Sequence, residues 1–364
     1  MAEDIEVLSS SGRVAASGSS NAMRTFPAKE LINISQNIGD QRARRDGSWY
    51  GYSDGDSWGA IPFSVSHLYR GQNGHYAPML PSIARGLQSE STGEIWRYAV
   101  ADQAKVVLRL AQSWWFSREL EYHPVAAHAA SQRLGFDQIA LAQHYGIPTG
   151  YLDLTDDFNV SAFFATCRET KRGWEPVEDG EGVIYRVGLA KLDSPFGRYQ
   201  PLGPQPLPRP TEQSAWVTEL PLCHSFEGWP DVGILGFVHE RRVGEHFLDM
   251  FAGGDRLFPP DPLAGVAAEI LSCREIPAAL LEGALESFAA DPHGVRAEHL
   301  PEIRGELAKL ATSVDYRRLL SDEQVASLLG DFEWRKKMLP DVAVKWRAVR
   351  TVPVTRLRDG GVDG

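Results

Sequence analysis

The strongest constraint on the fold is one segment in which a helix gives way to a short strand and then to a second helix. The pattern of residues 125–145 is helical, and it ends at Gly146, with Pro148 two residues further on. The apolar run 151–155 then suits a strand, and 159–166 suits a buried helix. A strand between two helices indicates a sheet that packs against helices.

Further strands and helices are predicted on both sides of this segment. Residues 61–69 form an apolar and aromatic run that predicts a strand, which delivers Arg70 to a loop. Residues 93–122 repeat large apolar side chains at helical spacing, and the β-branched run 183–187 predicts another strand. We therefore predict an α+β fold, with a small mixed or antiparallel sheet flanked by helices.

A proline-rich stretch over 195–210 precedes a predicted strand at 215–220. Proline lacks the backbone N–H that helix interiors and central strands need, so we predict a rigid loop here. This loop presents Glu212 and Gln213 just before the strand.

Length and composition indicate one principal domain with flanking pieces. A chain of 364 residues, 43% of them hydrophobic, can bury one large core, because single cores stop growing near ~250–300 residues. Residues 1–27 contain few large apolar side chains and are predicted to be a disordered tail. We assign 28–270 to the α+β domain and 271–364 to a mainly helical C-terminal extension.

The charge balance argues against a nucleic-acid-binding surface. The chain has 37 basic and 48 acidic residues and a formal net charge of −11, whereas a phosphate backbone is held by clustered lysine and arginine. The acidic start and the lack of an apolar run of ~18 residues predict neither a signal peptide nor a membrane span. We expect a cytoplasmic protein.

Cysteine and histidine positions predict neither disulfides nor a metal site. The three cysteines are odd in number and far apart in the sequence, which suits a reducing compartment. His239 starts like a zinc-protease helix, but Val243 stands where the second histidine belongs. Glu245, His246 and Asp249 fit a solvated helix face better than a metal site.

Arg70 is the first candidate ligand-binding residue. It stands between an apolar strand and Gly71, where its planar fork of donors suits a phosphate or pyrophosphate and glycine permits close approach of a ligand. The alternative is a structural arginine that pairs with a carboxylate of Asp153, Asp156 or Asp157.

A second candidate region ends the helix before Gly146. It presents Gln143, His144 and Tyr145, and several further polar residues follow within a short distance. The alternative is a capping network, in which Asp156 or Asp157 caps the next helix and a backbone carbonyl satisfies His144.

The same motifs resemble the FRG domain, whose name refers to an aromatic-Arg-Gly strand end. The resemblance runs from about residue 61 to about residue 270, and the matching strings are Leu68-Tyr69-Arg70-Gly71-Gln72, Leu80-Pro81-Ser82-Ile83-Ala84-Arg85, Gln143-His144-Tyr145-Gly146-Ile147-Pro148-Thr149, Leu152-Asp153-Leu154-Thr155, Ala162-Phe163-Phe164-Ala165, Arg209-Pro210-Thr211-Glu212-Gln213 and Phe258-Pro259-Pro260-Asp261. The chain departs from the family at Gly150, where a basic residue is common.

The order of these motifs is also similar to that of ADP-ribosyltransferases of the Arg-Ser-Glu type. That similarity implies that Arg70 holds the pyrophosphate of NAD, that Thr155 steadies the strand beside the nicotinamide ribose, and that Glu212 or Gln213 addresses the ribose 2′-hydroxyl. An amide at Gln213 stabilises a developing oxocarbenium ion less well than a carboxylate. The density of hydrogen-bonding groups beside apolar segments assigns the remaining motif residues to ligand binding: Tyr69, Gly71, Gln143, His144, Tyr145 and Asp153.

Three functions follow as expectations. The first is an NAD-using ADP-ribosyltransferase or NAD glycohydrolase in a bacterial stress, toxin or phage-defence setting, with NAD as substrate and no tightly bound cofactor. The second is a non-catalytic module that senses a nucleotide or binds a protein partner. The third is a metal-dependent nuclease, for which Asp153, Asp156 and Asp157 supply carboxylates but the net charge of −11 supplies no basic track.

Overall fold

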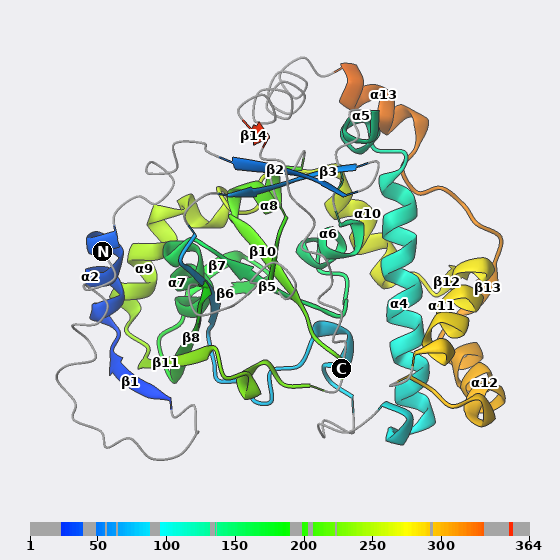
Figure 1. The fold of residues 1–364 in the computed structure, drawn as a ribbon, viewed down its shortest axis with the longest axis horizontal. Coiled ribbons are helices and arrows are strands. Elements are labelled where there is room, and N and C mark those ends of the chain that lie inside the picture. The colour runs from blue at the N-terminus through cyan, green and yellow to red at the C-terminus, as the bar shows by residue number, and fades with distance from the viewer. Residues whose placement is uncertain are drawn as a thin grey trace, which may run out of the picture.

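The chain folds as an α+β protein, as the sequence predicted (Figure 1). The computed structural model describes residues 23–38, 49–54, 57–62, 65–87, 95–131, 135, 137–189, 199–202, 207–222, 224–291, 294–330 and 349–351. Most of the tail predicted at 1–27 lies outside these residues, although its end, Arg24–Pro27, forms a strand. None of the helices in the described part combines the length and the apolar composition that a membrane span needs.

A seven-stranded sheet forms the centre of the structure, in the order β1-β11-β8-β4-β5-β10-β9. Strand β1 pairs in parallel with β11, and the other neighbours pair antiparallel. Its members are β1 (Arg24–Pro27), β4 (His67–Gln72), β5 (Tyr151–Thr155), β8 (Glu181–Gly188), β9 (Tyr199–Pro201), β10 (Ala215–Glu219) and β11 (Val232–Val238).

Helices surround this sheet and form a second layer beside it. They are α2 (Lys29–Ile38), α4 (Val100–Leu120), α5 (Pro124–Ser131), α6 (Gln138–His144), α7 (Phe158–Thr166), α8 (Pro208–Glu212), α9 (Arg241–Met250), α10 (Pro262–Ser272), α11 (Ala278–Ala290), α12 (Leu300–Leu310) and α13 (Asp322–Gly330). Helices α2, α7 and α9 share one core with β4, β8 and β11. The long helix α4 is the centre of the other layer and packs against α6, α10, α11 and α12.

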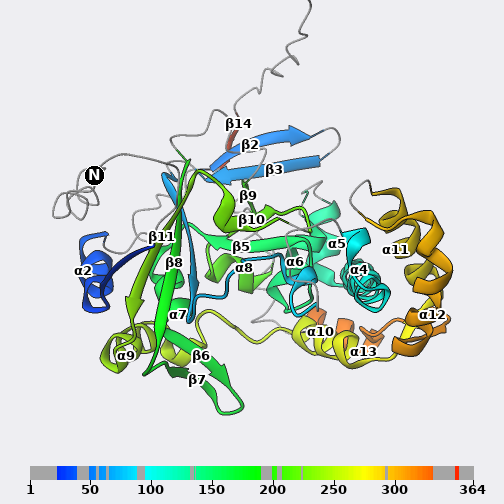
Figure 2. The same cartoon turned by 90° about the horizontal axis from the view of Figure 1, so that it is seen from below.

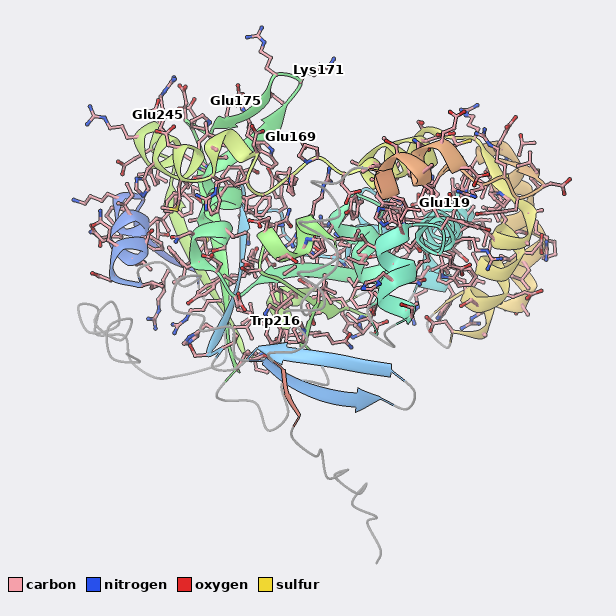
Figure 3. The ribbon with its side chains drawn as sticks, turned by 90° about the horizontal axis from the view of Figure 1, so that it is seen from above. Glu119, Glu169, Lys171, Glu175, Trp216 and Glu245 are labelled. Atoms are coloured by element: carbon pink, nitrogen blue, oxygen red, sulfur yellow. The ribbon has the colours of Figure 1, made fainter. Side chains whose placement is uncertain are left out.

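Three small sheets complete the described structure. The hairpin of β6 (Cys167–Thr170) and β7 (Gly173–Pro176) projects from the end of the molecule that Glu169, Lys171 and Glu175 mark in Figure 3. The other two are the pair β12 (Glu275–Pro277) and β13 (Thr312–Val314), and the sheet of β14 (Val349–Thr351), β2 (Trp49–Asp54) and β3 (Ser57–Pro62).

The two halves of the large sheet meet at one weak seam. Within β4 and β5, both fully described, the register contains the pair Tyr69 and Thr155, whereas β4 pairs with β8 along its whole length. Beyond that pair the two strands diverge. In Figure 2 the strands β8 and β11 accordingly run steeply across the direction of β5 and β10.

Three predicted elements differ from the structure. The strand predicted at 61–69 is not one strand, because Pro62 ends β3 and β4 begins at His67. Arg70 does not enter a loop but lies inside β4, in register with Tyr185 of β8. The helix predicted at 125–145 is two helices, because Asp137 accepts a hydrogen bond from the Ala140 amide and starts α6 afresh. The sequence gives no strong signal for that interruption beyond Gly135.

The third difference concerns the proline-rich stretch, whose end forms the short helix α8. Pro208 stands in its first turn, where backbone N–H groups have no intrahelical partner. Proline therefore removes no hydrogen bond from the helix at this position. Glu212 is therefore the last residue of a helix, and Gln213 is its C-cap.

Beyond α10 the described chain is mainly helical and packs on α4 without a core of its own. Glu119 of α4 anchors this region: its buried carboxylate accepts the Tyr316 hydroxyl at 2.8 Å and the amides of Leu319 and Leu320, each at 2.9 Å. These three donors compensate the Glu119 carboxylate for its burial. Figure 3 shows Glu119 within the helical layer, away from the β6–β7 hairpin. Residues 331–348 and 352–364 of the predicted extension lie outside the described part.

Gly71 allows α7 to lie directly on β4. A Cβ atom at this position would stand 1.7 Å from the Ser161 carbonyl oxygen and 2.8 Å from the Ala165 amide nitrogen. Both are backbone atoms of α7, so they cannot rotate away. The glycine that we expected to admit a ligand is thus required for the approach of a helix.

We predict that Gly71→Ala destabilises the protein by about 3 kcal/mol or more, because the new methyl group forces α7 away from β4. Gly150→Ala is the matched control, since a Cβ there meets only the Leu220 carbonyl oxygen at 4.0 Å. Urea unfolding of both variants measures the difference. Equal stabilities of the two variants would contradict this account of Gly71.

His239 connects the end of β11 to the chain that leaves β4. Its Nε2 atom lies 3.1 Å from the Asn73 carbonyl oxygen, and its side chain is buried. Burial lowers the pKa of His239, and main-chain contacts with Asn73 and Glu181 oppose the shift. The unfolded chain therefore binds this proton more readily, so stability is present above pH ~6.5 and falls as the pH drops below it.

We predict that the melting temperature of the wild-type protein falls more steeply between pH about 7.5 and about 5.5 than that of His239→Gln. Glutamine keeps a donor for the Asn73 carbonyl but does not titrate. His123, whose pKa burial also lowers, is present in both proteins and contributes equally. Parallel pH profiles for the two proteins would refute the assignment to His239.

Candidate functional site

A cavity of about 130 Å³ lies beside the seam between β4 and β5. Residues from α7 close one side of it, among them Ser161 and Phe164. Seven of the residues that the sequence singled out line this cavity: Tyr69, Arg70, Gly71, His144, Asp153, Thr155 and Gln213. Gln143, Tyr145 and Glu212 do not line it.

Arg70 bridges the gap between the diverging strands. Its Nη1 atom donates to the main-chain oxygen of Asp153 at 2.6 Å, while its buried Nε atom has no hydrogen-bond partner among the described residues. Burial lowers the pKa of Arg70, and the charge of Asp153 opposes the shift. In the described part of the chain the guanidinium forms no ion pair with a carboxylate, so the structural pairing that we considered is not what holds it.

The two other aspartates have structural partners. Asp156 accepts the indole N–H of Trp216 at 3.0 Å, and Asp157 caps α7 by accepting the Asn159 amide at 2.9 Å. The capping alternative is therefore right for Asp157. Among the described residues, no three histidine, cysteine or acidic side chains converge to hold a metal ion.

His144 has one ring nitrogen satisfied and one open. Its Nδ1 atom lies 3.0 Å from the Gln213 Oε1 atom, and Gln213 donates its Nε2 to the Leu257 carbonyl at 3.1 Å. An amide oxygen only accepts, so Nδ1 carries the proton in this arrangement. The partner of His144 is a side chain rather than the backbone carbonyl of the capping alternative.

The open Nε2 atom of His144 faces the carboxylate of Asp153. It lies 3.5 Å from Oδ1, and neither atom has a hydrogen-bond partner among the described residues. A protonated ring would attract the carboxylate, whereas a neutral ring sets two acceptors against each other. His144 and Asp153 therefore each direct one atom without a hydrogen-bond partner toward the other.

Gln143 positions Asp153 from outside the cavity. Its Nε2 atom donates to Asp153 Oδ2 at 3.2 Å, and its Oε1 atom accepts the hydroxyls of Ser82 at 2.6 Å and Thr149 at 2.8 Å. These contacts fix one carboxylate oxygen and leave the other for the cavity. Sequence reasoning assigned Gln143 to the ligand, but the structure makes it a support.

Thr155 and Gln213 hold the end of β5 to the turn before β10. The Thr155 hydroxyl donates to the Gln213 carbonyl at 2.8 Å and accepts the Asp157 amide at 3.0 Å. Ser214 in this turn has a φ of 50°, in the left-handed region that side chains rarely adopt. The side-chain groups of Thr155 and Gln213 are thus already engaged by the protein.

Tyr145 points away from the cavity into the helical layer. Its hydroxyl donates to Asp261 Oδ2 at 2.6 Å, and Arg209 lies 4.8 Å above its ring. Asp261 also caps α10 through the Leu263 amide. Burial raises the pKa of Tyr145, which stays a neutral donor. The family's central and closing motifs therefore meet here, and the Tyr145 hydroxyl is engaged by Asp261.

Sequence reasoning missed the wall that α7 supplies. Val160, Ser161 and Phe164 line the cavity from α7, and nothing in their spacing separates them from ordinary core residues.

Comparison with known proteins identifies the segment that supplies most of the residues lining this cavity. Residues 66–173 match the family model of the FRG domain, and they include β4, α6, β5 and α7. Neither the curated proteins nor the solved structures contain a match to the chain. The segment from Ser66 to Gly173, which carries Arg70, His144 and Asp153, is an FRG domain.

Proposed function

We propose that the cavity binds the ribose and phosphate of a nucleotide, as a nucleotide-sensing module. The observation that supports this proposal is that three lining residues from three segments each have a buried polar atom without a hydrogen-bond partner among the described residues. These atoms are Arg70 Nε, His144 Nε2 and Asp153 Oδ1. An unpaired buried polar group costs about 1–3 kcal/mol, so a ligand that pairs with all three gains affinity.

The chemistry of the three atoms fits a sugar phosphate. A guanidinium binds phosphate oxygens through charge-assisted hydrogen bonds, and a carboxylate accepts from ribose hydroxyls. The cavity of about 130 Å³ has room for one such group. Pockets that hold whole cofactors measure roughly 300–1,000 Å³, so the remainder of the ligand extends beyond this cavity.

A second candidate is an enzyme that cleaves the nicotinamide bond of NAD, and the pair His144 and Asp153 favours it. In that reaction the bond between the ribose C1′ and nicotinamide breaks, and nicotinamide leaves with the electron pair. Water or an acceptor hydroxyl attacks C1′, and its proton passes to the pair. The Asp153 carboxylate takes the role that we expected of Glu212 or Gln213, because Gln213 is engaged and Glu212 lies outside the cavity.

We predict that Arg70→Ala weakens the binding of ADP-ribose by about ten- to a hundredfold, since charge-assisted hydrogen bonds contribute about 1.5–3 kcal/mol. The fold should persist, because the apolar neighbours remain. Leu152→Ala should do the reverse and cost about 2–5 kcal/mol of stability, because Leu152 is fully buried. Calorimetric binding and thermal melting of both variants decide this.

In the same experiment, Arg70→Lys distinguishes the effect of the positive charge from that of the guanidinium, which bridges to Asp153. Lysine keeps the charge but lacks the planar fork, so we expect weakened binding and a melting temperature near that of the wild type. If Arg70→Ala unfolds as readily as Leu152→Ala, Arg70 has a structural role and the proposed binding site is wrong.

Asp153→Asn tests the second candidate. If the protein cleaves NAD, release of nicotinamide should fall by at least about a hundredfold in this variant, while ADP-ribose binding falls far less, because asparagine keeps the shape without the charge. Glu212→Gln is the control, since Glu212 does not line the cavity. If the wild type releases no nicotinamide, with or without cell extract, the enzyme hypothesis is rejected and the sensing module remains the proposed function.

A further inference from the structure

A larger cavity lies between the large sheet and the helical layer. It measures about 580 Å³, within the roughly 300–1,000 Å³ of pockets that hold small ligands. The sheet supplies lining residues from β5, β9 and β10, and the helical layer supplies them from α4, α6 and α11. Among the described residues, none lines both this cavity and the one at Arg70, so the two are distinct.

Gly150 leaves space in the wall of this cavity. It lines the cavity immediately before β5, and a Cβ atom there would meet nothing closer than the Leu220 carbonyl oxygen at 4.0 Å. A side chain at this position would therefore have room to extend into the cavity. The glycine keeps that room for a ligand.

The two facing walls are mainly apolar. Their aliphatic and aromatic side chains come from both layers: Ile83, Val106, Leu110, Leu220, Leu222 and Phe288. A ligand that covers these side chains removes apolar surface from water, which favours binding. The walls therefore suit a ligand with an apolar body.

Both charged residues in the described lining are carboxylates, Glu219 of β10 and Asp291 at the end of α11. Both are exposed, so they lie at the mouth of the cavity. Glu219 is the register partner of Tyr151, so these two side chains lie on the same face of the sheet. The Tyr151 hydroxyl donates to Asp137 at 2.6 Å and not to Glu219, whose carboxylate it leaves to a ligand.

Helix α11 adds negative potential at the same place. Ser287 and Asp291 line the cavity from its C-terminal end, and its last turn contains no basic residue. The carbonyl end of a helix carries a partial negative charge that favours a cation. The basic residues next to the lining residues of α4 are engaged elsewhere: Lys105 pairs with Asp102 at 2.8 Å, and Arg109 donates to main-chain oxygens at 2.7 and 2.9 Å.

We propose that this cavity binds a small organic cation with an apolar body, of the class of aryl-alkyl ammonium ions. The ammonium group lies at the mouth beside Glu219 and Asp291, and the apolar body lies against α4 and Leu220. A neutral ligand of the same shape lacks the complementary charge, and an anion is repelled. This site is independent of the nucleotide site proposed at Arg70.

Calorimetric titration of the full chain with three probes of similar shape tests the proposal. The probes are phenylbutylamine, phenylbutanol and phenylbutyrate, of which the amine is a cation at pH 7, as lysine is. We expect the amine to bind at least about fivefold more tightly than the alcohol, and the carboxylate not to bind measurably. The preference for the amine should shrink in about 0.5 M salt, because exposed charges are screened.

Substitutions in the lining locate the binding. Glu219→Gln combined with Asp291→Asn should remove the preference for the amine and leave the binding of the alcohol. Gly150→Leu should abolish the binding of both, because leucine fills the space, whereas Gly150→Ala adds one methyl group and should retain it. Glu169→Gln, on the β6–β7 hairpin, is the control for the loss of a carboxylate.

The proposal is wrong if the amine does not bind, if the amine and the alcohol bind equally, or if Gly150→Leu leaves the affinity for the amine unchanged. Melting temperatures measured alongside identify loss of fold. If Gly150→Leu unfolds, the comparison of amine and alcohol in the variant without the two carboxylates still decides. Titration with ADP-ribose is the separate test of the site at Arg70, and its failure leaves the proposal for this cavity intact.

Discussion

The seam between β4 and β5 is the feature on which the site depends. In a continuous sheet the Asp153 carbonyl would accept a backbone N–H of the neighbouring strand, but here it accepts Nη1 of Arg70 at 2.6 Å. A side chain thus takes the place of a ladder hydrogen bond. The cavity lies beside this seam and is lined by Arg70 from one strand and Asp153 from the other.

The motif residues of the sequence have two different physical roles. One group holds elements together: Gly71 admits α7 to β4, Thr155 ties β5 to the turn before β10, and Tyr145 joins α6 to the cap of α10. The other group leaves atoms free toward the cavity: Arg70, His144 and Asp153. Fixed supports beneath a few unpaired atoms are what a binding site requires, because preorganisation lowers the entropic cost of binding.

The helical layer is coupled to the same elements. Helix α4 shares its core with α6, which carries Gln143 and His144, and with α10, whose cap receives Tyr145. Glu119 fastens the segment before α13 to that helix. The C-terminal region is therefore connected to the cavity through packed helices and buried hydrogen bonds.

The sequence by itself determined the fold class, most element positions and the residues around the cavity. Periodicity, helix-ending glycine and proline, and β-branched runs are local signals, and the motif strings are long enough to identify the FRG domain. They could not separate supports from ligand-facing residues. Gln143, His144 and Tyr145 are consecutive and equally polar, yet one holds Asp153, one faces the cavity and one binds Asp261.

Only the tertiary structure decided those directions, because each depends on a partner far away in the chain. The Ser161 carbonyl that requires Gly71 and the Gln213 amide that fixes the His144 proton both arise from packing across elements. The division of the sheet was equally invisible, since β4 and β5 each read as ordinary strands. In the described register one pair, Tyr69 and Thr155, joins them, and no local pattern encodes this long-range pairing.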